Sequence, residues 1–363
     1  MTVTIKAKAL EAFVADIFAS AGCSKEEGDR IGRYLVSANL SGHDSHGVVR
    51  VPRYAENKKD GVVLTDVTVD VVIDTPVIAV VDGKYGFGQT VTPQAVRIGI
   101  EKCRKNGLSA VTLRNAGHIG RVGDWAEMAA EAGLISIHFV NAAGSVLVAP
   151  YGGVQRRFST APYCIGVPRP GLGPLVLDFA TSIVAEGKVL VASQGGKKLP
   201  EGALIGPDGQ PSSDPHTLYG DYVPAGPRNY RQGTGAIRAF GDHKGSGLAF
   251  MCELLGGSLS GNGATDPQRG KFANGMLSFY VDPKVVDPAG FFPADVAKYV
   301  DFVKSSAPVS AGGEVLVPGE SEARMRAERM ASGVPLPDDT WAAIVETARS
   351  VGLDERRIQQ ATM

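Results

Sequence analysis

The sequence predicts an α/β protein whose alternating core lies between helical segments. Between residues 67 and 281, apolar runs typical of strands alternate with stretches of helical periodicity. The residues before and after this core have helical periodicity alone. The composition is 44% hydrophobic and 21% charged over 363 residues, which is enough chain for a large buried core.

The N-terminal part is predicted to contain two helices and a polar motif. Residues 4–21 carry apolar side chains at helical spacing. Ser24 followed by Glu27 is a capping box that opens the second helix. Ser41 and Gly42 end this helix, so the stretch "LSGHDSHGVVRVPRY" (40–54) begins at a helix C-terminus.

The core elements follow in order between turn signals. Strands are expected at "VTVDVVID" and "VIAVVDG", joined by a Thr-Pro turn. The next expected elements are the helix "TPQAVRIGIEKCRKNG", the strand "SAVTLR", the helix "GDWAEMAAEAG" and the strand "LISIHFV". The core closes with the strand "LVLDFAT", a helix at 183–193, a polar segment at 194–235, a helix at 245–260 and the strand "GMLSFYV". From about residue 290 the chain is helical again, with a late loop at Pro335 and Pro337.

Charge and cysteine content exclude several classes of protein. Lys and Arg number 37 against 38 Asp and Glu, so no excess charge attracts nucleic acid or an anionic membrane. The four cysteines are far apart without a CxxC, which favours reduced thiols in a cytoplasmic protein over a disulfide framework. Glu11 and Asp16 interrupt the N-terminal apolar residues, unlike a signal peptide, and no apolar run is long enough to span a bilayer.

The common nucleotide and metal fingerprints are missing from the sequence. There is no GxGxxG after a strand, no GxxxxGK[ST] and no HExxH. The histidines are not spaced as a zinc site, so no metal is expected. A Rossmann domain and a P-loop are therefore disfavoured.

Four polar clusters are candidates for chemistry. The first is the stretch 40–54, and the second is "RNAGHIGRVGDW" (114–125), a glycine-rich strand-to-helix connection suited to an anion. In the third, "LDFATS", Asp178 follows an apolar strand, where α/β proteins usually bind ligands. In the fourth, "FGDHKGSGLAFMCELLGG", His243 and Lys244 precede a helix start.

Each cluster also has a purely structural interpretation. Asp178 could cap the following helix, Lys244 could be a solvated surface lysine, and the glycines could serve turns alone. The functional interpretation is favoured because three of the six histidines lie at glycine-flanked junctions beside Arg, Lys or Asp. His138 and His216 lack such neighbours and are interpreted as structural.

Four motifs carry a resemblance to a known family. "NLSGHDSHGVVRVPRY", "NAGHIGRVGDWAE", "VLDFATSIVAEGKVLVA" and "DHKGSGLAFMCELLGGSLSG" resemble the malate/L-lactate dehydrogenase family with a non-Rossmann fold. The resemblance extends to "VPGESEARMRAERMASGVPL" near the C-terminus. Two departures are that the family's usual "GTNP" is "STAP" here (159–162), and that Arg50 occurs in many members but not all. The substrate range is therefore not fixed by the resemblance.

The resemblance implies a three-layer α/β/α fold with a mixed sheet, of the sulfolactate-dehydrogenase type, wrapped by N- and C-terminal helices. The implied parts are residues 1–60 with the catalytic motif, a cofactor-binding core at 65–285, and a helical part at 290–363 that packs back on the first. It also implies a homodimer with active sites near the subunit interface, and NAD or NADP as cofactor. The implied cofactor-binding residues are His46, Gly120, Arg121, Val122, Val176, Leu177, Asp178, Phe179, Ala180, His243, Lys244, Asn274, Gly319, Glu320, Ser321 and Glu322.

The chemistry of a 2-hydroxy acid assigns roles to the remaining residues. Histidine, with an unperturbed pKa of ~6.5, can take or return the hydroxyl proton near neutrality. His46 is the first choice for this role and His118 the second. Arg50 and Ser45 are expected to bind the substrate, with the guanidinium gripping its carboxylate. Asp178 would hold a catalytic imidazole in its tautomer or meet the cofactor.

The predicted function is therefore an NAD(P)-dependent oxidoreductase of small 2-hydroxy and 2-oxo acids. A reductase of a cyclic imine carboxylate and a ureidoglycolate-type dehydrogenase remain open within the enzyme class. A non-redox protein that binds a phosphorylated metabolite is the alternative from a different class. The cofactor preference and the identity of the acid are open at this point.

Overall fold

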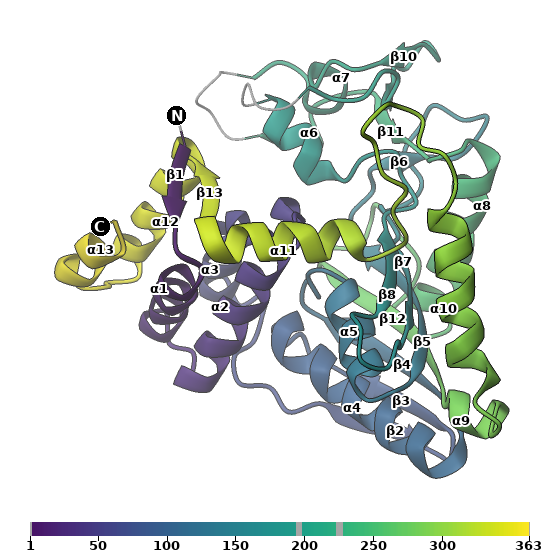
Figure 1. The fold of residues 1–363 in the computed structure, drawn as a ribbon. Coiled ribbons are helices and arrows are strands. Elements are labelled where there is room, and N and C mark those ends of the chain that lie inside the picture. The colour runs from purple at the N-terminus through teal and green to yellow at the C-terminus, as the bar shows by residue number, and fades with distance from the viewer. Residues whose placement is uncertain (1, 194–197, 223–227, 363) are drawn as a thin grey trace.

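A mixed seven-stranded sheet lies at the centre of the molecule (Figure 1). The computed structural model describes residues 2–193, 198–222 and 228–362. The strand order is β2-β3-β4-β12-β5-β7-β8; β3 and β4 are parallel, and the other described pairs of neighbours are antiparallel. The strands are β2 (Asp70–Asp74), β3 (Ile78–Asp82), β4 (Leu108–Ala116), β5 (Ile135–Ala143), β7 (Tyr163–Val167), β8 (Leu175–Phe179) and β12 (Ala273–Val281). The prediction of an α/β fold with a mixed sheet is confirmed.

Helices cover both faces of this sheet. On β5, Val140 shares a core with Trp125 of α5 (Gly123–Glu131), whereas the adjacent Phe139 packs with Ala249 and Cys252 of α8 (His243–Cys252). Because successive strand residues point to opposite faces, α5 and α8 lie on opposite sides of the sheet. Helix α4 (Gly88–Asn106) lies beside α5, and the π-helical turn η3 (Glu253–Ser258) continues α8. The core thus has three layers.

The two ends of the chain share a separate core. It joins the helices α1 (Ala7–Ser20), α2 (Lys25–Leu40) and α3 (Val51–Lys59) to α12 (Asp338–Ser350) and α13 (Glu355–Thr362). Within this core the rings of Phe13 and Trp341 lie 5.4 Å apart. Helix α11 (Glu320–Ser332) runs from the edge of the sheet toward this terminal core (Figure 1). Residues from the two ends of the chain therefore form one hydrophobic core.

The start of α2 confirms the predicted N-cap but not the complete capping box. Ser24 Oγ accepts a hydrogen bond from the Glu27 amide at 3.1 Å. The Glu27 carboxylate is buried and accepts from Thr90 Oγ1 at 2.7 Å and from the Asp66 amide at 2.8 Å, instead of returning to Ser24. The Glu27 side chain thus makes tertiary hydrogen bonds with Asp66 and Thr90 in place of the local bond that would complete the capping box.

Two predicted boundaries at the chain ends are wrong. Residues 4 and 5, expected at the start of the helix over 4–21, instead belong to the strand β1 (Thr2–Ile5). It pairs antiparallel with β13 (Val334–Pro337), where Pro335 and Pro337 predicted a loop. A two-stranded sheet tolerates proline because each strand is an edge with one side free of ladder bonds.

A second, smaller sheet was not predicted. Its order is β10-β9-β11-β6, with β6 (Val148–Ala149), β9 (Leu204–Ile205), β10 (Pro211–Ser212) and β11 (Ala236–Arg238). These strands are too short to give a periodic signal. The helices α6 (Glu186–Ser193) and α7 (His216–Tyr219) accompany it, and α9 (Pro283–Val286) and α10 (Phe291–Lys304) follow β12. Residues 194–197 and 223–227 of the predicted polar segment lie outside the described residues.

All four cysteines are buried and unpaired, in agreement with the prediction of free thiols. Burial raises the pKa of Cys23 to about 12 and that of Cys103 to about 11, so both thiols stay protonated. Among the described residues, no helix is both long and apolar enough to cross a membrane.

Candidate active site

The motif at residues 40–54 forms two short 3-10 turns between helices. After α2 come η1 (Asp44–His46) and η2 (Val48–Arg50), and then α3. Asn39 holds these turns: its Oδ1 accepts from the Val48 amide at 2.8 Å, and its Nδ2 donates to Asp44 at 2.6 Å. A Cβ at Gly47 would collide with the Asn39 side chain, so only glycine fits there. Arg329 of α11 binds Asp44 at 2.7 Å and fixes the motif from the other side.

The imidazoles of His46 and His118 lie face to face. Their centroids are 5.3 Å apart and their planes differ by 15°. His118 comes from the glycine-rich connection after β4, so the structure brings the first two predicted clusters together. Burial, then His118 and Arg50, hold the pKa of His46 well below its usual value. Burial and the Arg50 charge lower the pKa of His118 to about 3, so both rings are neutral at neutral pH.

A buried tyrosine holds the His118 ring. Tyr54 Oη lies 2.6 Å from His118 Nδ1, and Gln89 Nε2 donates to the same oxygen at 3.0 Å. By contrast, Nδ1 of His46 is buried without a partner among the described residues. The two imidazoles therefore differ: a hydrogen-bond chain orients His118, whereas the buried Nδ1 of His46 has no partner among the described residues.

Arg50 lies beside the histidine pair without a carboxylate partner among the described residues. Its Nε donates to the main-chain oxygen of Ser45 at 2.6 Å. Glu56, the partner weighed for it on sequence grounds, instead pairs with Arg53 at 3.3 Å. The terminal nitrogens of Arg50 are thus free to meet an anion, and its charge already lowers the pKa of both rings. Ser45 packs against Gly187 of α6, which closes this side of the site.

The Arg121 side chain points into the protein. The residue is 2% exposed, and its guanidinium binds Asp124 at 3.0 Å and Glu127 at 2.8 Å. Burial opposes its charge, but the two carboxylates outweigh burial and raise the pKa of Arg121. Of the predicted cofactor loop, Gly120 to Val122, the Arg121 side chain is therefore already bound to carboxylates of the protein. Gly120 has a φ of +72°, a conformation that favours glycine.

Asp178 caps helix α5 rather than the helix that follows it. Its Oδ2 accepts from the Gly123 amide at 2.7 Å, at the helix end where an anion was expected. Burial raises the pKa of this carboxyl group, while the neighbouring His43 and Arg121 lower it. No described hydrogen bond joins Asp178 to either imidazole of the stacked pair.

Of the remaining predicted cofactor residues, Gly319 lies against the start of β8. The Val176 amide donates to Pro318 O at 3.4 Å, and a Cβ on Gly319 would contact the Val176 amide. Asn274 Oδ1 accepts from the Ile119 amide at 3.0 Å and thereby fixes the loop that carries His118. Glu320 binds Lys304 at 2.5 Å, Ser321 is exposed, and Leu177 is 39% exposed.

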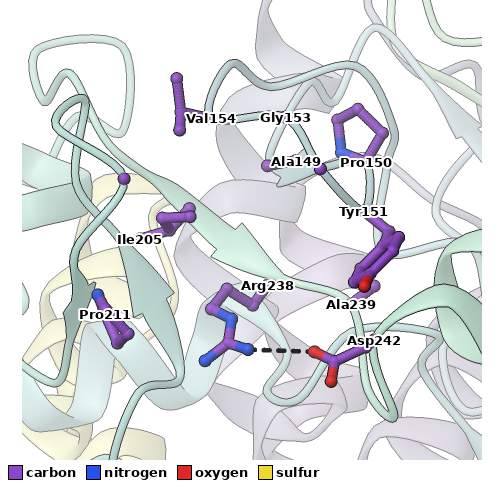
Figure 2. A pocket seen from close by; sticks show the side chains of 12 residues that line it. Ala149, Pro150, Tyr151, Gly153, Val154, Ile205, Pro211, Arg238, Ala239 and Asp242 are labelled. Atoms are coloured by element: carbon purple, nitrogen blue, oxygen red, sulfur yellow. Dashed lines mark hydrogen bonds and ion pairs between the residues drawn. The ribbon is translucent and has the colours of Figure 1, made fainter.

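His243 and Lys244 lie apart from the stacked pair. Both are exposed at the first turn of α8, where His243 meets the ring of Tyr151 at 5.9 Å. Beside them is a cavity of about 330 Å³ whose walls include Pro150, Ile205 and Pro211, with the Arg238–Asp242 ion pair on one side (Figure 2). The contact of Phe240 with Phe179, at 5.3 Å, joins this region to β8.

Sequence reasoning missed three side chains of the site. His43 Nε2 lies 3.4 Å from Glu322 Oε1 and links the 40–54 motif to α11. Tyr54 stood at the end of the quoted stretch, but nothing in the sequence connected it to His118. Gln89 gave no signal at all, because its contact depends on the packing of α4 against α3. His138, interpreted as structural, is buried between Ser136 and Ser278.

The alanine of the "STAP" departure has a backbone conformation that few residues other than glycine adopt. Ala161 adopts a φ of +32°, which asparagine tolerates better than alanine. Ser159 is buried and donates to Glu253 at 2.7 Å. Among the described residues, no group of three or more His, Cys, Asp or Glu side chains could hold a metal ion.

An α/β fold with paired imidazoles beside an unpaired arginine has the elements of an enzyme that oxidises hydroxy acids. The chain matches the malate/L-lactate dehydrogenase family over residues 5–345 and belongs to that family. It is 36% identical to hydroxycarboxylate dehydrogenase B of Escherichia coli K12 over 358 residues, 97% of this chain and 96% of that one.

Solved structures agree with this membership. A malate/lactate dehydrogenase structure from E. coli matches with a TM-score of 0.91 and 35% identity, covering 99% of this chain and 98% of that one. The delta1-piperideine-2-carboxylate reductase of Pseudomonas syringae pv. tomato matches with a TM-score of 0.78 and 29% identity, covering 96% and 99%. The predicted family and fold class are confirmed.

Proposed function

We propose that this protein is an NAD(P)-dependent oxidoreductase that interconverts a small 2-hydroxy acid and its 2-oxo acid. The observation that carries the proposal is the Arg50 guanidinium, which lies beside the stacked His46 and His118 rings without a carboxylate partner among the described residues. A substrate carboxylate supplies the missing charge, and its hydroxyl or keto oxygen then has an imidazole within the same site.

His118 is the better candidate for carrying the proton. The sequence favoured His46, but Tyr54 orients only the His118 ring among the two. An imidazole held by a second group keeps a defined tautomer, which proton transfer requires. The buried, unpartnered Nδ1 of His46 fits a polar group of the cofactor instead.

The nicotinamide cofactor supplies or accepts the hydride when bound. The residues proposed to hold it are the main chain of Gly120–Val122, the strand end Val176–Ala180, Asn274 and the Gly319–Glu322 turn. Support comes from two contacts at β8, of Val176 with Pro318 and of Asp178 with the Gly123 amide, and from the φ of +72° at Gly120, a conformation that favours glycine. His243 and Lys244 are proposed to meet the end of the cofactor away from the histidine pair.

A homodimer is part of the proposal. Helix α10 has no buried residue and exposes Phe291, Tyr299 and Phe302 at 69%, 65% and 72%. Large aromatic surfaces of this kind are typical of protein interfaces. A cytoplasmic location is proposed from the four unpaired, buried thiols.

Reduction of a cyclic imine carboxylate is the second candidate. The likeness to a piperideine-2-carboxylate reductase favours it, since both substrates carry a carboxylate beside the carbon that accepts hydride. Family membership favours either reaction over the non-redox binding protein.

The test is a reductase panel of 2-oxo acids and cyclic imine carboxylates with NADH and with NADPH, without added metal. Consumption of reduced cofactor with at least one 2-oxo acid is the expected result. Turnover of imines alone would favour the second candidate, and turnover of neither would contradict the proposal.

A further inference from the structure

A buried chain of hydrogen bonds ends at the His118 ring. It runs from Gln89 on α4 to Tyr54 on α3 and on to His118, which follows β4. Gln89 and Tyr54 are 1% and 4% exposed, so water does not compete for these bonds. The rings of Phe18 and Phe87 pack against Tyr54 and restrict its position.

The direction of each hydrogen bond follows from the number of protons available. The Tyr54 oxygen accepts from Gln89 Nε2 at 3.0 Å, so its single proton must point elsewhere. His118 Nδ1 lies at 2.6 Å and the His118 main-chain oxygen at 3.3 Å. The shorter contact directs the phenol proton to Nδ1. A neutral His118 ring then carries its own proton on Nε2.

We propose that Gln89 is a positioning residue of the active site, which acts through the Tyr54 phenol to keep the His118 proton on Nε2, ready for delivery to the substrate oxygen. The inference rests on the proposed function, in which His118 carries the proton.

The proton transfers balance without the formation of a charged imidazole. As the substrate carbon accepts hydride, its oxygen takes the Nε2 proton and the Nε2–H bond breaks. His118 Nδ1 simultaneously takes the Tyr54 proton, so the ring stays neutral and the negative charge moves to the Tyr54 oxygen. Gln89 Nε2 donates to that phenolate. After the product leaves, the Nδ1 proton returns to the Tyr54 oxygen, and the partly exposed His118 ring recovers its Nε2 proton from solvent on the substrate side. In the oxidative direction each of these transfers is reversed.

The electrostatics of the site agree with such a relay. Burial and the Arg50 charge lower the pKa of His118 to about 3, which disfavours an imidazolium donor. Burial raises the pKa of Tyr54 to about 12, while Gln89 and Arg50 act in the opposite direction. An alkoxide is a stronger base than a phenolate, so transfer from Tyr54 toward the substrate oxygen is downhill.

The test reads the His118 tautomer by long-range 1H–15N NMR of histidine-labelled protein without substrate. A His118→Asn spectrum assigns the signal among the six histidines. The unmodified protein should show the Nε2–H form. In Gln89→Glu the new carboxylate accepts the Tyr54 proton, Tyr54 accepts from His118, and the ring proton should move to Nδ1.

Steady-state kinetics on the same variants distinguishes a positioning role of Gln89 from a purely structural role. Gln89→Glu should lower kcat for reduction by about 10²-fold, within the range of general acid–base catalysis, with KM values nearly unchanged. Tyr54→Phe should cause a similar loss. It should also make kcat rise as pH falls, because a protonated His118 imidazolium must then donate the proton to the substrate oxygen. Thr92→Val is the matched control, since Thr92 is also buried on α4 and its hydroxyl has no partner among the described residues. This substitution should change neither tautomer nor rate.

Three possible results test the proposed role of Gln89 and separate it from the proposed function. An Nδ1–H form in the unmodified protein would overturn the proposal. An unchanged tautomer in both Gln89→Glu and Tyr54→Phe would overturn it as well. A tautomer that shifts in a protein reducing no 2-oxo acid would support the hydrogen-bond assignment and contradict the proposed function alone.

Discussion

The parallel stacking of His46 on His118, with centroids 5.3 Å apart, joins a turn between two N-terminal helices to a connection of the central sheet. Burial lowers the pKa of both rings, Arg50 adds to the effect on both, and the His118 ring adds to the effect on His46. Two neutral imidazoles thus lie beside an arginine whose charge no carboxylate of the described residues neutralises.

The two histidines should respond differently to truncation. His118→Ala should lower kcat by about 10²–10⁴-fold, because the site loses its proton carrier. His46→Ala should act mainly on the KM for the cofactor, since its free Nδ1 is proposed to meet that group. Steady-state kinetics in both directions checks the prediction. Near-normal turnover in His118→Ala with a large loss in His46→Ala would exchange the two roles.

Arg50→Lys should weaken substrate binding while leaving the cofactor in place. Lysine keeps the charge but loses the planar fork, so a bidentate contact with a carboxylate is lost. A charge-assisted hydrogen bond is worth about 1.5–3 kcal/mol, which corresponds to a KM for the 2-oxo acid raised about 10- to 100-fold.

Arg53→Lys is the matched control for that experiment. Arg53 lies three residues further on, is exposed, and pairs with Glu56 at 3.3 Å. Its replacement should leave every Michaelis constant unchanged. Equal constants for Arg50→Lys and the unmodified protein would remove Arg50 from the substrate site.

Chelation should leave the activity intact. Among the described residues, no cluster of His, Cys, Asp and Glu side chains could hold a metal ion, and the proposed chemistry uses side chains of the protein for the proton. Turnover should survive prolonged treatment with a chelator. A complete loss of activity that a divalent ion restores would show the metal-free mechanism to be wrong.

The buried His138 should make the protein less stable in mild acid. Burial lowers the pKa of His138 to about 3, below its value of ~6.5 in an unfolded chain. The unfolded state therefore binds more protons below pH ~6.5, and stability falls as the pH drops from there toward 3. At pH ~5 this single group costs about 2 kcal/mol of unfolding free energy.

Denaturant unfolding at pH 7.5 and pH 5 measures this effect at one protein concentration. In His138→Asn the loss of stability between the two pH values should be smaller by about 2 kcal/mol. The exposed His216→Asn leaves the buried ring in place and should retain the full loss. Identical losses in all three proteins would show that His138 does not contribute.

The sequence by itself determined the parts of this protein that depend on local patterns. Periodicity identified α5 and β5, because their apolar spacing matches a helix and a half-buried strand. Ser24 fixed the start of α2 through its own hydroxyl. Glycine-flanked histidines pointed to the 40–54 stretch and to the loop around His118, which the structure places in one site.

Only the tertiary structure decided how these residues act on one another. The pairing of Thr2–Ile5 with Val334–Pro337 joins the two ends of the chain, which no local pattern specifies. Arg121 carries the charge expected of a ligand-binding loop, yet Asp124 and Glu127 bind it inside the protein. Gln89 reaches Tyr54 only because α4 packs against α3. A hydrogen bond forms only when the donor–acceptor distance is right to within a few tenths of an ångström. Between segments distant in sequence, packing alone sets that distance.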